Sequence, residues 1–494
     1  MMKTKKVIVI GCGIGGITAA THLAQRGVQV TVFEKNSRPG GRCDRISRDG
    51  HHFDTGPTLL VMQRLYEAEF AALGASMWEA LNLQRVDPTY HLVFDDGSQL
   101  ALTSDMTSMQ QQIERFERGS FQGFLRYMDE GYRHYQIGIE KLVLPDFRKP
   151  TAFFNLSNLP LLQQVKPLVK HYDNMKHYFH DPHLKAAFTF QDVYMGLSPF
   201  EAPATFSMMP YTELAHGVWY PEGGMYRIVE ALMDMARAAG VEFVFDTKVD
   251  QINVNGASTH GVVVDGELLS ADAVLANADL PYVYQNLLPQ DGQAKKMDRK
   301  RYSCSVFSFF WGVDKTYETL PPHTLFLVDD YRANFDCITH DLGLPANPSV
   351  YIHAPARLDA CMAPQGQDTL IAVVPVGHMS DNGDQDWAAL RDEARQHVFR
   401  KLASLGINDL AAHIKFEINF TPLSWKKRYN LAKGSTHGLC HNLVQLGYFR
   451  PDFQHPRYRN LYFTGASTRP GTGLPTAMVS GRQSANRILD DLAG

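Results

Sequence analysis

Residues 5–34 constrain the fold more than any other part of the chain. A short apolar run over 7–10 predicts a buried strand, and the glycine-rich stretch Gly11-Cys12-Gly13-Ile14-Gly15-Gly16 follows it. The next pattern, over 17–26, predicts a helix that ends at Gly27, and 28–33 predicts a second strand that closes on Glu34. Strand, glycine turn, helix, strand and acid in this order are typical of a dinucleotide-binding βαβ unit.

Each of these residues has a separate physical role in such a unit. Gly11 allows the tight turn, Gly13 lets the backbone approach a pyrophosphate, and Gly16 lets the helix pack closely on the strand. The free N–H groups at the helix N-terminus attract the phosphates, and Glu34 can accept hydrogen bonds from a ribose. Chance glycines in an ordinary βαβ turn are the alternative. The full context favours dinucleotide binding, and the residues that we expect to contribute are Gly11, Gly13, Gly15, Gly16, Glu34 and Lys35.

Composition narrows the class of protein. A chain of 494 residues with 44% apolar and 20% charged residues is typical of a folded protein with two or three lobes. A net charge of −4 argues against a nucleic-acid partner. Six scattered cysteines without a CxxC pair suggest reduced thiols in the cytoplasm. No window approaches eighteen apolar residues, so we expect no membrane-spanning helix, although contact with a membrane surface stays possible.

The C-terminal part contains a second glycine-rich turn. Residues 460–466 predict a strand that enters a turn, 469–475 is rich in glycine and proline, and 476–489 predicts a helix. A second helix N-terminus suits a second electron-rich part of the same ligand. No second GxGxxG follows a strand, so we expect no separate NAD(P)H site.

The residues just after Glu34 indicate which dinucleotide binds. Gly40-Gly41-Arg42 and Gly56-Pro57 resemble the FAD-binding opening of the large flavoprotein family that holds amine oxidases, carotenoid desaturases and Rab GDP-dissociation inhibitors. The resemblance implies FAD as the cofactor, with Arg42 beside the pyrophosphate and Val249 on the adenine side. The further residues that it places at the cofactor are Gly41, Gly56, Pro57, Gly465, Ala466, Gly473, Leu474 and Pro475.

The resemblance becomes closer in the second half of the chain. The segments 349–355, which contains Tyr-Ile-His-Ala-Pro, and 363–366, Ala-Pro-Gln-Gly, resemble the bacterial-type phytoene desaturases and the diapocarotenoid desaturases. This family implies an α/β fold with a Rossmann-like FAD-binding domain of the amine-oxidase type, an interleaved mixed-sheet substrate domain and a helical lid or membrane-facing subdomain. We assign 1–85, 214–279 and 441–494 to the FAD-binding domain, 86–107 and 280–440 to the substrate domain, and 108–213 to the helical subdomain.

The reaction implied by the resemblance is dehydrogenation of a long isoprenoid polyene, with a hydride passing to FAD. Because no nucleophile triad or paired-carboxylate motif is visible, the catalytic side chains are left unassigned. Glu213, Glu222 and Asp359 are possible proton acceptors, but we interpret them as surface or turn residues. The pair His437 and His441 lacks an acidic third ligand, so we expect no metal.

The implied partners follow from the substrate. A long apolar isoprenoid or carotenoid is a membrane lipid, so we expect a peripheral protein on the cytoplasmic face of the cell membrane, with oxygen or a quinone as electron acceptor. The segment 151–170 carries nine large apolar side chains with Lys149, Lys166 and Lys170 within or beside it. It is either a lid helix or an interfacial element that dips into the bilayer, and the substrate slightly favours the second interpretation.

Other functions stay open at this stage. Arg469 and the pair Thr476-Ala477 depart from the desaturase pattern, so an oxygenase, a ketolase or an isomerase of the same superfamily is an alternative. An amine oxidase is more distant, because the stretch from Ser467 to Met478 has no aromatic residue. A flavin-free escort protein that binds lipid is a further alternative, against which the intact glycines speak.

Overall fold

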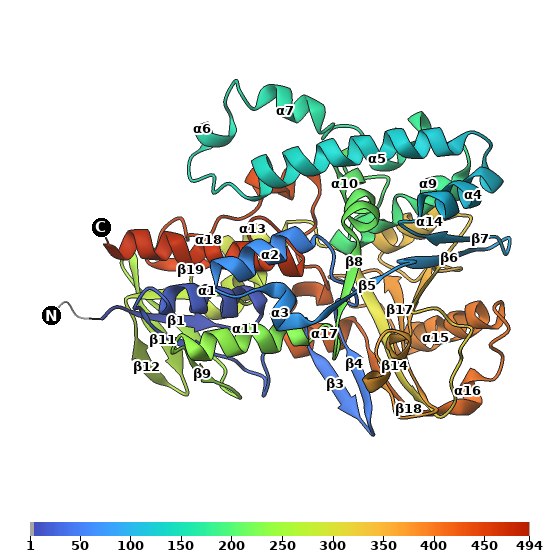
Figure 1. Cartoon of the computed structure of the whole chain (residues 1–494). Helices are drawn as coiled ribbons and strands as arrows, with labels where there is room; N and C mark the ends of the chain where they lie inside the picture. Colours follow the sequence, from blue (N-terminus) through green and yellow to red (C-terminus); the bar gives the residue numbers. More distant parts are fainter. Residues whose placement is uncertain (1–3, 494) are drawn as a thin grey trace.

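The fold has two large β-sheets with a group of helices across both. The computed structural model describes residues 4–493. It contains a five-stranded parallel sheet and a seven-stranded mixed sheet. Helices from the second quarter of the chain lie along the top of the view in Figure 1, above both sheets. The predicted α/β class is therefore confirmed.

The parallel sheet collects strands from three distant parts of the chain. Its order is β19 (Leu461–Phe463), β13 (Ala273–Ala276), β1 (Lys6–Ile10), β2 (Gln29–Phe33) and β9 (Glu242–Val244). Central β1 is paired in parallel on both sides, with Val9 opposite Val32 and Leu275. Such a strand is covered on both faces, which explains its uninterrupted apolar sequence. The glycine turn leads from β1 into α1 (Ile14–Ala24), as the sequence predicts.

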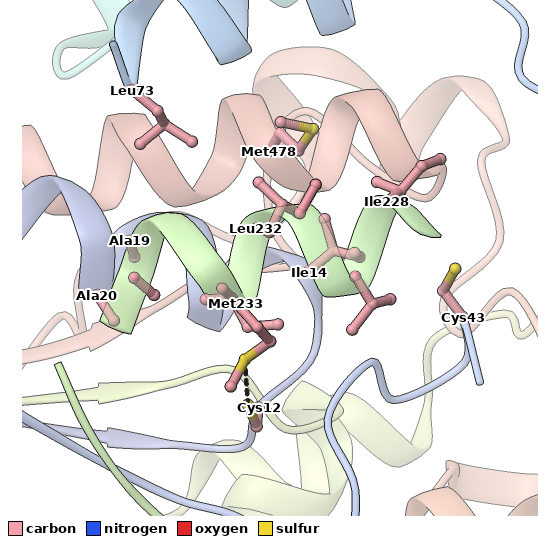
Figure 2. Close-up of a cluster of buried hydrophobic side chains, with 14 of the residues drawn as sticks. Cys12, Ile14, Ala19, Ala20, Cys43, Leu73, Ile228, Leu232, Met233 and Met478 are labelled. Carbon is pink, nitrogen blue, oxygen red and sulfur yellow. Dashed lines mark hydrogen bonds between the residues drawn. The ribbon is translucent and has the colours of Figure 1, made fainter. Parts of the chain in front are cut away.

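Three helices cover one face of this sheet. They are α1, α11 (Arg227–Ala238) and α18 (Leu474–Ala493), and Figure 2 shows their shared core. The small side chains of Ala19 and Ala20 are fully buried on α1, so α11 and α18 can approach closely. Below them the sulfur of Cys12 lies 3.8 Å from that of Met233. This packing fixes the turn that begins α1.

The other face of the parallel sheet packs against a small antiparallel sheet. Its strands are β10 (Gln251–Asn255), β11 (Ser258–Val264) and β12 (Glu267–Ser270). Ile252 and Val262 pack there against Ile8 and Val274. Val249, which the resemblance places on the adenine side of the cofactor, lies outside any strand, in the connection before β10. Its side chain is nevertheless buried.

The mixed sheet is built almost entirely from the region after residue 300. Its order is β18 (Ile414–Phe420), β14 (Ser305–Val313), β17 (Asp368–Val376), β16 (Val350–His353), β15 (His323–Leu327), β6 (Tyr90–Phe94) and β7 (Gln99–Leu102). Strands β6 and β7 form an antiparallel hairpin. Helix α15 (Trp387–Ala403) covers one face, where Phe307, Trp311 and Val398 share a core.

The region 104–217 is mainly helical but less regular than the sequence predicts. Long helices α4 (Met106–Phe116) and α5 (Ser120–Ile137) are followed by the short α6 (Pro150–Phe153), α7 (Leu159–Gln164), α8 (His171–Asn174), α9 (Pro182–Ala187) and α10 (Met208–Tyr211). Two π-helical turns, η1 (Gly138–Val143) and η5 (Thr212–His216), directly extend α5 and α10. Turns of this kind are frequent at functional sites.

Two ribbons join the sheets and were not predicted. One is the hairpin β3 (Arg45–Arg48) and β4 (His51–Asp54), and the other pairs β5 (Leu83–Val86) with β8 (Val218–Pro221). The segment 57–81 contains two helices, α2 (Gln63–Ala72) and α3 (Met77–Leu81). Gly74, with φ +85°, lies between them and breaks the helical path.

Candidate active site

A cavity of about 840 Å³ runs between the parallel sheet, the mixed sheet and the helical region. All residues predicted to hold FAD line this cavity except Gly16. They come from the β1–α1 turn, the segments after β2 and β4, the connection before β10, and the start of α18. Residues far apart in the sequence thus share one site. This site can form only if the backbone of the β1–α1 turn has enough space.

The glycines of this site fit a cofactor that lies against backbone. A Cβ at Gly56 would lie 2.0 Å from the carbonyl oxygen of Arg42, so the two cofactor-facing segments can pass each other only with glycine here. Gly16 has another role, because a Cβ there would lie 2.3 Å from the carbonyl oxygen of Gly11. It lets α1 start close to β1, as the sequence predicts, and it supports the site without lining it.

Two backbone hydrogen bonds fix the Glu34 carboxylate just after the end of β2. Its Oε2 accepts a hydrogen bond from the Cys12 amide at 2.8 Å, and its Oε1 accepts one from the Asn36 amide at 2.9 Å. Burial raises the pKa of Glu34, while these backbone donors act in the opposite direction. The neighbouring Lys35 donates to the Lys427 carbonyl and to Asn430 Oδ1, at 2.9 and 3.0 Å. A fixed carboxylate with remaining lone pairs suits ribose hydroxyl groups.

Arg42 and Asp279 provide opposite charges in the cavity wall. The Arg42 Nη1 donates to the Thr436 carbonyl at 2.8 Å, which fixes the guanidinium direction. Burial lowers the pKa of Arg42, and the facing carboxylate of Asp279 raises it. Burial also raises the pKa of Asp279, which accepts hydrogen bonds from Ser467 and from the Ala432 amide. A guanidinium held in this way suits a pyrophosphate.

The loop that carries Gly465 and Ala466 is held from behind by a buried arginine. Arg450 is 1% exposed, and its guanidinium donates to main-chain carbonyls only. The acceptors are the carbonyls of Leu439, Cys440, Gln445, Ala466 and Thr468. Arg450 was not predicted from the sequence, since no motif marks an arginine that binds carbonyls.

His441 positions the next part of the same loop. Its Nε2 accepts the Thr472 amide at 3.0 Å, so Nδ1 carries the proton and donates to the Met195 carbonyl at 3.2 Å. From the sequence, His441 was a candidate metal ligand only, and this positioning role was not predicted. Across residues 4–493, no three side chains of the metal-binding types converge on one point.

The remainder of the cavity is mainly apolar because the side chains on each strand of the mixed sheet point alternately to its two faces. Successive strand residues point to opposite faces. On β14, β15, β16 and β17 one set of side chains packs under α15, while the alternate set faces the cavity. The cavity-facing set is Val306, Ser308, Leu325, Leu327, Tyr351, Val373 and Pro375. The opposite wall comes from η1 and from the region 190–209.

Polar groups interrupt the apolar wall in two places. The Tyr351 hydroxyl hydrogen-bonds with Thr58 Oγ1 and with His323 Nδ1, both at 2.7 Å. Nearby, the Tyr194 hydroxyl donates to that of Tyr90. Tyr351 and Tyr90 lie side by side, with ring centroids 6.2 Å apart. Thr58 directly follows Gly56-Pro57, so this polar group adjoins the segment expected beside the flavin.

The interpretation of Glu213 as a surface or turn residue is wrong. Glu213 is 1% exposed and lies on η5 behind Tyr194. It was misjudged because an isolated acid in a helical pattern is usually exposed. Glu222 is exposed, and the half-buried Asp359 caps a short helix and accepts the Gly223 amide at 2.6 Å, as expected of a turn residue.

The cavity reaches the protein surface between two apolar segments. Phe154 and Phe449 both line it, yet they are 55% and 48% exposed. Their rings lie 6.0 Å apart, so 147–170 and 443–449 meet at this mouth. Arg469 joins the two segments, because its guanidinium donates to the Phe147 carbonyl at 2.9 Å and to the Tyr448 carbonyl at 2.7 Å. Arg469, which departs from the desaturase pattern, therefore lies at the mouth of the cavity.

Comparison with known proteins assigns the family. The family model described as flavin-containing amine oxidoreductase matches residues 14–489. The chain belongs to this family. It is 39% identical to a phytoene desaturase of Fusarium fujikuroi, covering 99% of this chain and 90% of the relative. It is 31% identical to a 4,4′-diapophytoene desaturase (4,4′-diaponeurosporene-forming) of Staphylococcus aureus strain Newman, covering 99% of each.

A solved structure shows the same fold. The cyclohexylamine oxidase of Brevibacterium oxydans superposes with a TM-score of 0.62 at 16% identity, covering all of both chains. The likeness concerns the fold alone. Together these findings confirm the predicted flavoprotein fold, the FAD cofactor and the resemblance to carotenoid desaturases. The enzyme is an FAD-dependent oxidoreductase. Within residues 4–493, no helix has both the length and the apolar character to cross a bilayer.

Proposed function

We propose that this enzyme is a desaturase of carotenoid biosynthesis, which introduces double bonds into a long isoprenoid such as phytoene or diapophytoene. One observation carries the proposal: a single cavity is lined both by the residues expected around FAD and by the apolar side chains of the mixed sheet. The names of the relatives, which act on phytoene or on diapophytoene, support the substrate class. A polyene needs a long apolar cavity that extends away from the flavin, and the mixed sheet supplies one wall of this cavity.

The protein's part in the reaction is mainly alignment. FAD, when bound, accepts the hydride that leaves an allylic carbon. Gly11, Gly13, Glu34, Arg42 and Val249 would hold the nucleotide part, and Gly465 to Pro475 would hold the ring end. The alternating face of the mixed sheet would keep the chain extended and exclude water from the reacting carbons. Oxygen or a membrane quinone would take the electrons afterwards, and we propose no separate NAD(P)H site.

The first test is product analysis in two hosts, one that accumulates phytoene and one that accumulates its C30 analogue. The expected result is a pigment with a longer conjugated system in at least one host, since each new double bond extends the chromophore. The product's length and conjugation identify the substrate and the number of steps. Unchanged precursor in both hosts, with FAD-loaded protein present, would contradict the proposal.

Two other activities remain because they would use the same cavity. A carotenoid ketolase or isomerase would leave the precursors unchanged but would convert carotenoids that are already coloured, so those are the next substrates to test. Amine oxidation is disfavoured because the channel wall contributed by the mixed sheet contains no charged side chain among residues 4–493. A flavin-free escort role is not supported, since the family is flavin-containing.

We also propose that the mouth of the cavity lies on the cytoplasmic face of the cell membrane. Leu156, Leu168 and Val444 are 90%, 79% and 68% exposed, and they surround the mouth lined by Phe154 and Phe449. Lys149 and Lys170 are exposed beside them. Apolar side chains with basic neighbours are typical of an interfacial element, and here they adjoin the entrance for a lipid substrate.

The double variant Leu156→Glu with Leu168→Glu is expected to bind vesicles at least tenfold more weakly than the parent enzyme. Each leucine that enters the bilayer contributes about 1.5–3 kcal/mol, and each glutamate adds repulsion from anionic headgroups. Co-sedimentation with phosphatidylglycerol vesicles measures the effect. Leu268→Glu is the control, because Leu268 is 50% exposed on β12, away from the mouth. Equal binding of all three proteins would contradict the proposed membrane face.

A further inference from the structure

Glu213 is a buried acid without a cationic partner. Its Oε2 accepts a hydrogen bond from Gln191 Nε2 at 3.1 Å, and within residues 4–493 its Oε1 has no partner at hydrogen-bond distance. Burial raises the pKa of Glu213 to about 7, and Tyr194 and Gln191 act against this shift. An acid kept in such surroundings normally costs stability, so its presence next to a reaction cavity calls for a role.

Two tyrosines connect this acid to the cavity. Tyr194, which is close enough to Glu213 to change its pKa, donates a hydrogen bond to the Tyr90 hydroxyl. Both tyrosine rings line the cavity. The Tyr90 ring lies next to Tyr351, whose hydroxyl binds Thr58 beside the Gly56-Pro57 segment. The path therefore starts in the part of the cavity that adjoins the flavin-facing backbone.

We propose that Glu213 is the final acceptor of the proton released in the dehydrogenation, and that the proton reaches it through the hydroxyls of Tyr90 and Tyr194. This proposal rests on the proposed function above. Removal of a hydride from one carbon leaves a cation delocalised along the polyene. The C–H bond on the neighbouring carbon then breaks, and its electron pair forms the new double bond.

The proton balance of this step is complete. In the resting structure the Tyr194 hydroxyl donates to Tyr90. The two hydroxyl groups therefore first turn, Tyr90 toward Tyr194, and Tyr194 toward the Oε1 of Glu213, which has no hydrogen-bond partner within residues 4–493. The proton from carbon then goes to the Tyr90 oxygen, the Tyr90 proton goes to Tyr194, and the Tyr194 proton goes to the carboxylate of Glu213. The hydride goes to FAD, which is the oxidant. Glu213 ends as a neutral acid, and both tyrosines end as they began. The negative charge of Glu213 also favours the cation across an apolar wall of low dielectric.

His323 is the competing acceptor, since it hydrogen-bonds with Tyr351. Burial and the stacked His353 lower the pKa of His323 well below its ordinary value, so its imidazole is a weak base. The titratable groups that face Glu213 are three tyrosines: Tyr90 on β6, Tyr127 on α5 and Tyr194. Burial raises the pKa of each well above 10, so Glu213 is the group in this network that changes charge near neutral pH.

The test compares Glu213→Gln and Tyr90→Phe with the FAD-loaded parent enzyme in single-turnover dehydrogenation. We expect a loss of at least 100-fold in Glu213→Gln, which is the range of general base catalysis, and at least tenfold in Tyr90→Phe. The parent rate should rise through pH 7 as Glu213 ionises, and this rise should be absent in Glu213→Gln. Tyr127→Phe is the control, because the Tyr127 hydroxyl binds His171 and the Phe188 carbonyl instead.

Two measurements without turnover complete the test. Infrared spectra of the resting holoenzyme should contain a protonated carboxyl band that disappears between pH 6 and 8 and is missing in Glu213→Gln. Because the folded-state pKa is raised above the ordinary value of 4.5, ionisation disfavours folding as the pH passes from 4.5 to 7 and beyond. Glu213→Gln should therefore melt higher than the parent at pH 8, and the difference should vanish near pH 4.5.

Each outcome of these experiments either supports the proposed role of Glu213 or overturns it. Lost turnover with raised thermal stability at pH 8 supports a proton acceptor, because a purely structural acid would not show this combination. Normal turnover in both variants, or no carboxyl band that titrates in this range, would overturn the proposal. If the parent enzyme makes no desaturated product in either host, the proposed function fails instead, and the two failures are distinguishable.

Discussion

Gly16→Ala is expected to give an enzyme that is purified without FAD and melts well below the parent. A Cβ at this position would lie 2.3 Å from the Gly11 carbonyl oxygen and 2.9 Å from Asn277 Nδ2. The first neighbour is backbone and cannot turn aside, so α1 would move away from β1. Overpacking of this kind costs about 3 kcal/mol, and it would also displace the amides expected to face the pyrophosphate. Flavin absorbance of the purified protein and thermal melting measure the two effects.

The control for this prediction is Gly292→Ala. Gly292 also has a right-handed backbone, with φ −68°, but a Cβ there would have no neighbour within 4 Å. It should keep its FAD and its melting temperature, because an alanine fits this conformation and has space. If Gly16→Ala matches Gly292→Ala in both measurements, close packing of α1 on β1 does not support the site.

Arg450→Met is expected to destabilise the enzyme by about 4 kcal/mol and to weaken FAD binding. Removal of the guanidinium leaves several buried carbonyls without donors, and each buried polar group that loses its partner typically costs about 1–3 kcal/mol. Ala466, whose carbonyl it holds, lines the cofactor cavity. Arg450→Lys should recover only part of the loss, because an ammonium has three donors and no planar fork.

Thermal melting and flavin titration of the apoprotein check this second prediction. Arg391→Met is the matched control, since Arg391 pairs with the adjacent, exposed Asp392 and such pairs contribute about 0–1 kcal/mol. Equal melting temperatures for Arg450→Met and Arg391→Met would show that the loop around Ala466 is held by other contacts.

Local patterns in the sequence predicted the parts of this enzyme that have regular geometry. The β1–α1–β2 unit and helix α18 were predicted because each has a clear pattern and a glycine-rich turn at its start or end. The ribbons β3–β4 and β5–β8 were missed because their partners and register depend on tertiary contacts.

The candidate site was predictable where backbone determines it and unpredictable where side chains meet across domains. The residues expected around FAD lie in glycine-rich turns, which a motif reveals. Arg450, His441 and Glu213 lie in irregular or π-helical segments, and their hydrogen-bond partners lie between 5 and 246 residues away in the sequence, at no regular spacing. A single sequence contains no local signal for such contacts. The usual expectation that a charged residue is exposed then gives the wrong result.

The order of strands in the parallel sheet has a consequence for biosynthesis. Central β1 is made first, but its neighbour β13 follows more than 250 residues later, and β19 and α18 complete the sheet and the flavin end of the cavity only after residue 460. A growing chain on the ribosome therefore exposes unpaired parallel strands for most of its synthesis, which favours dependence on chaperones. Cofactor loading is then expected to be a late event, since the nascent N-terminal half contains the turn proposed to hold the phosphates but not the residues proposed to hold the flavin ring.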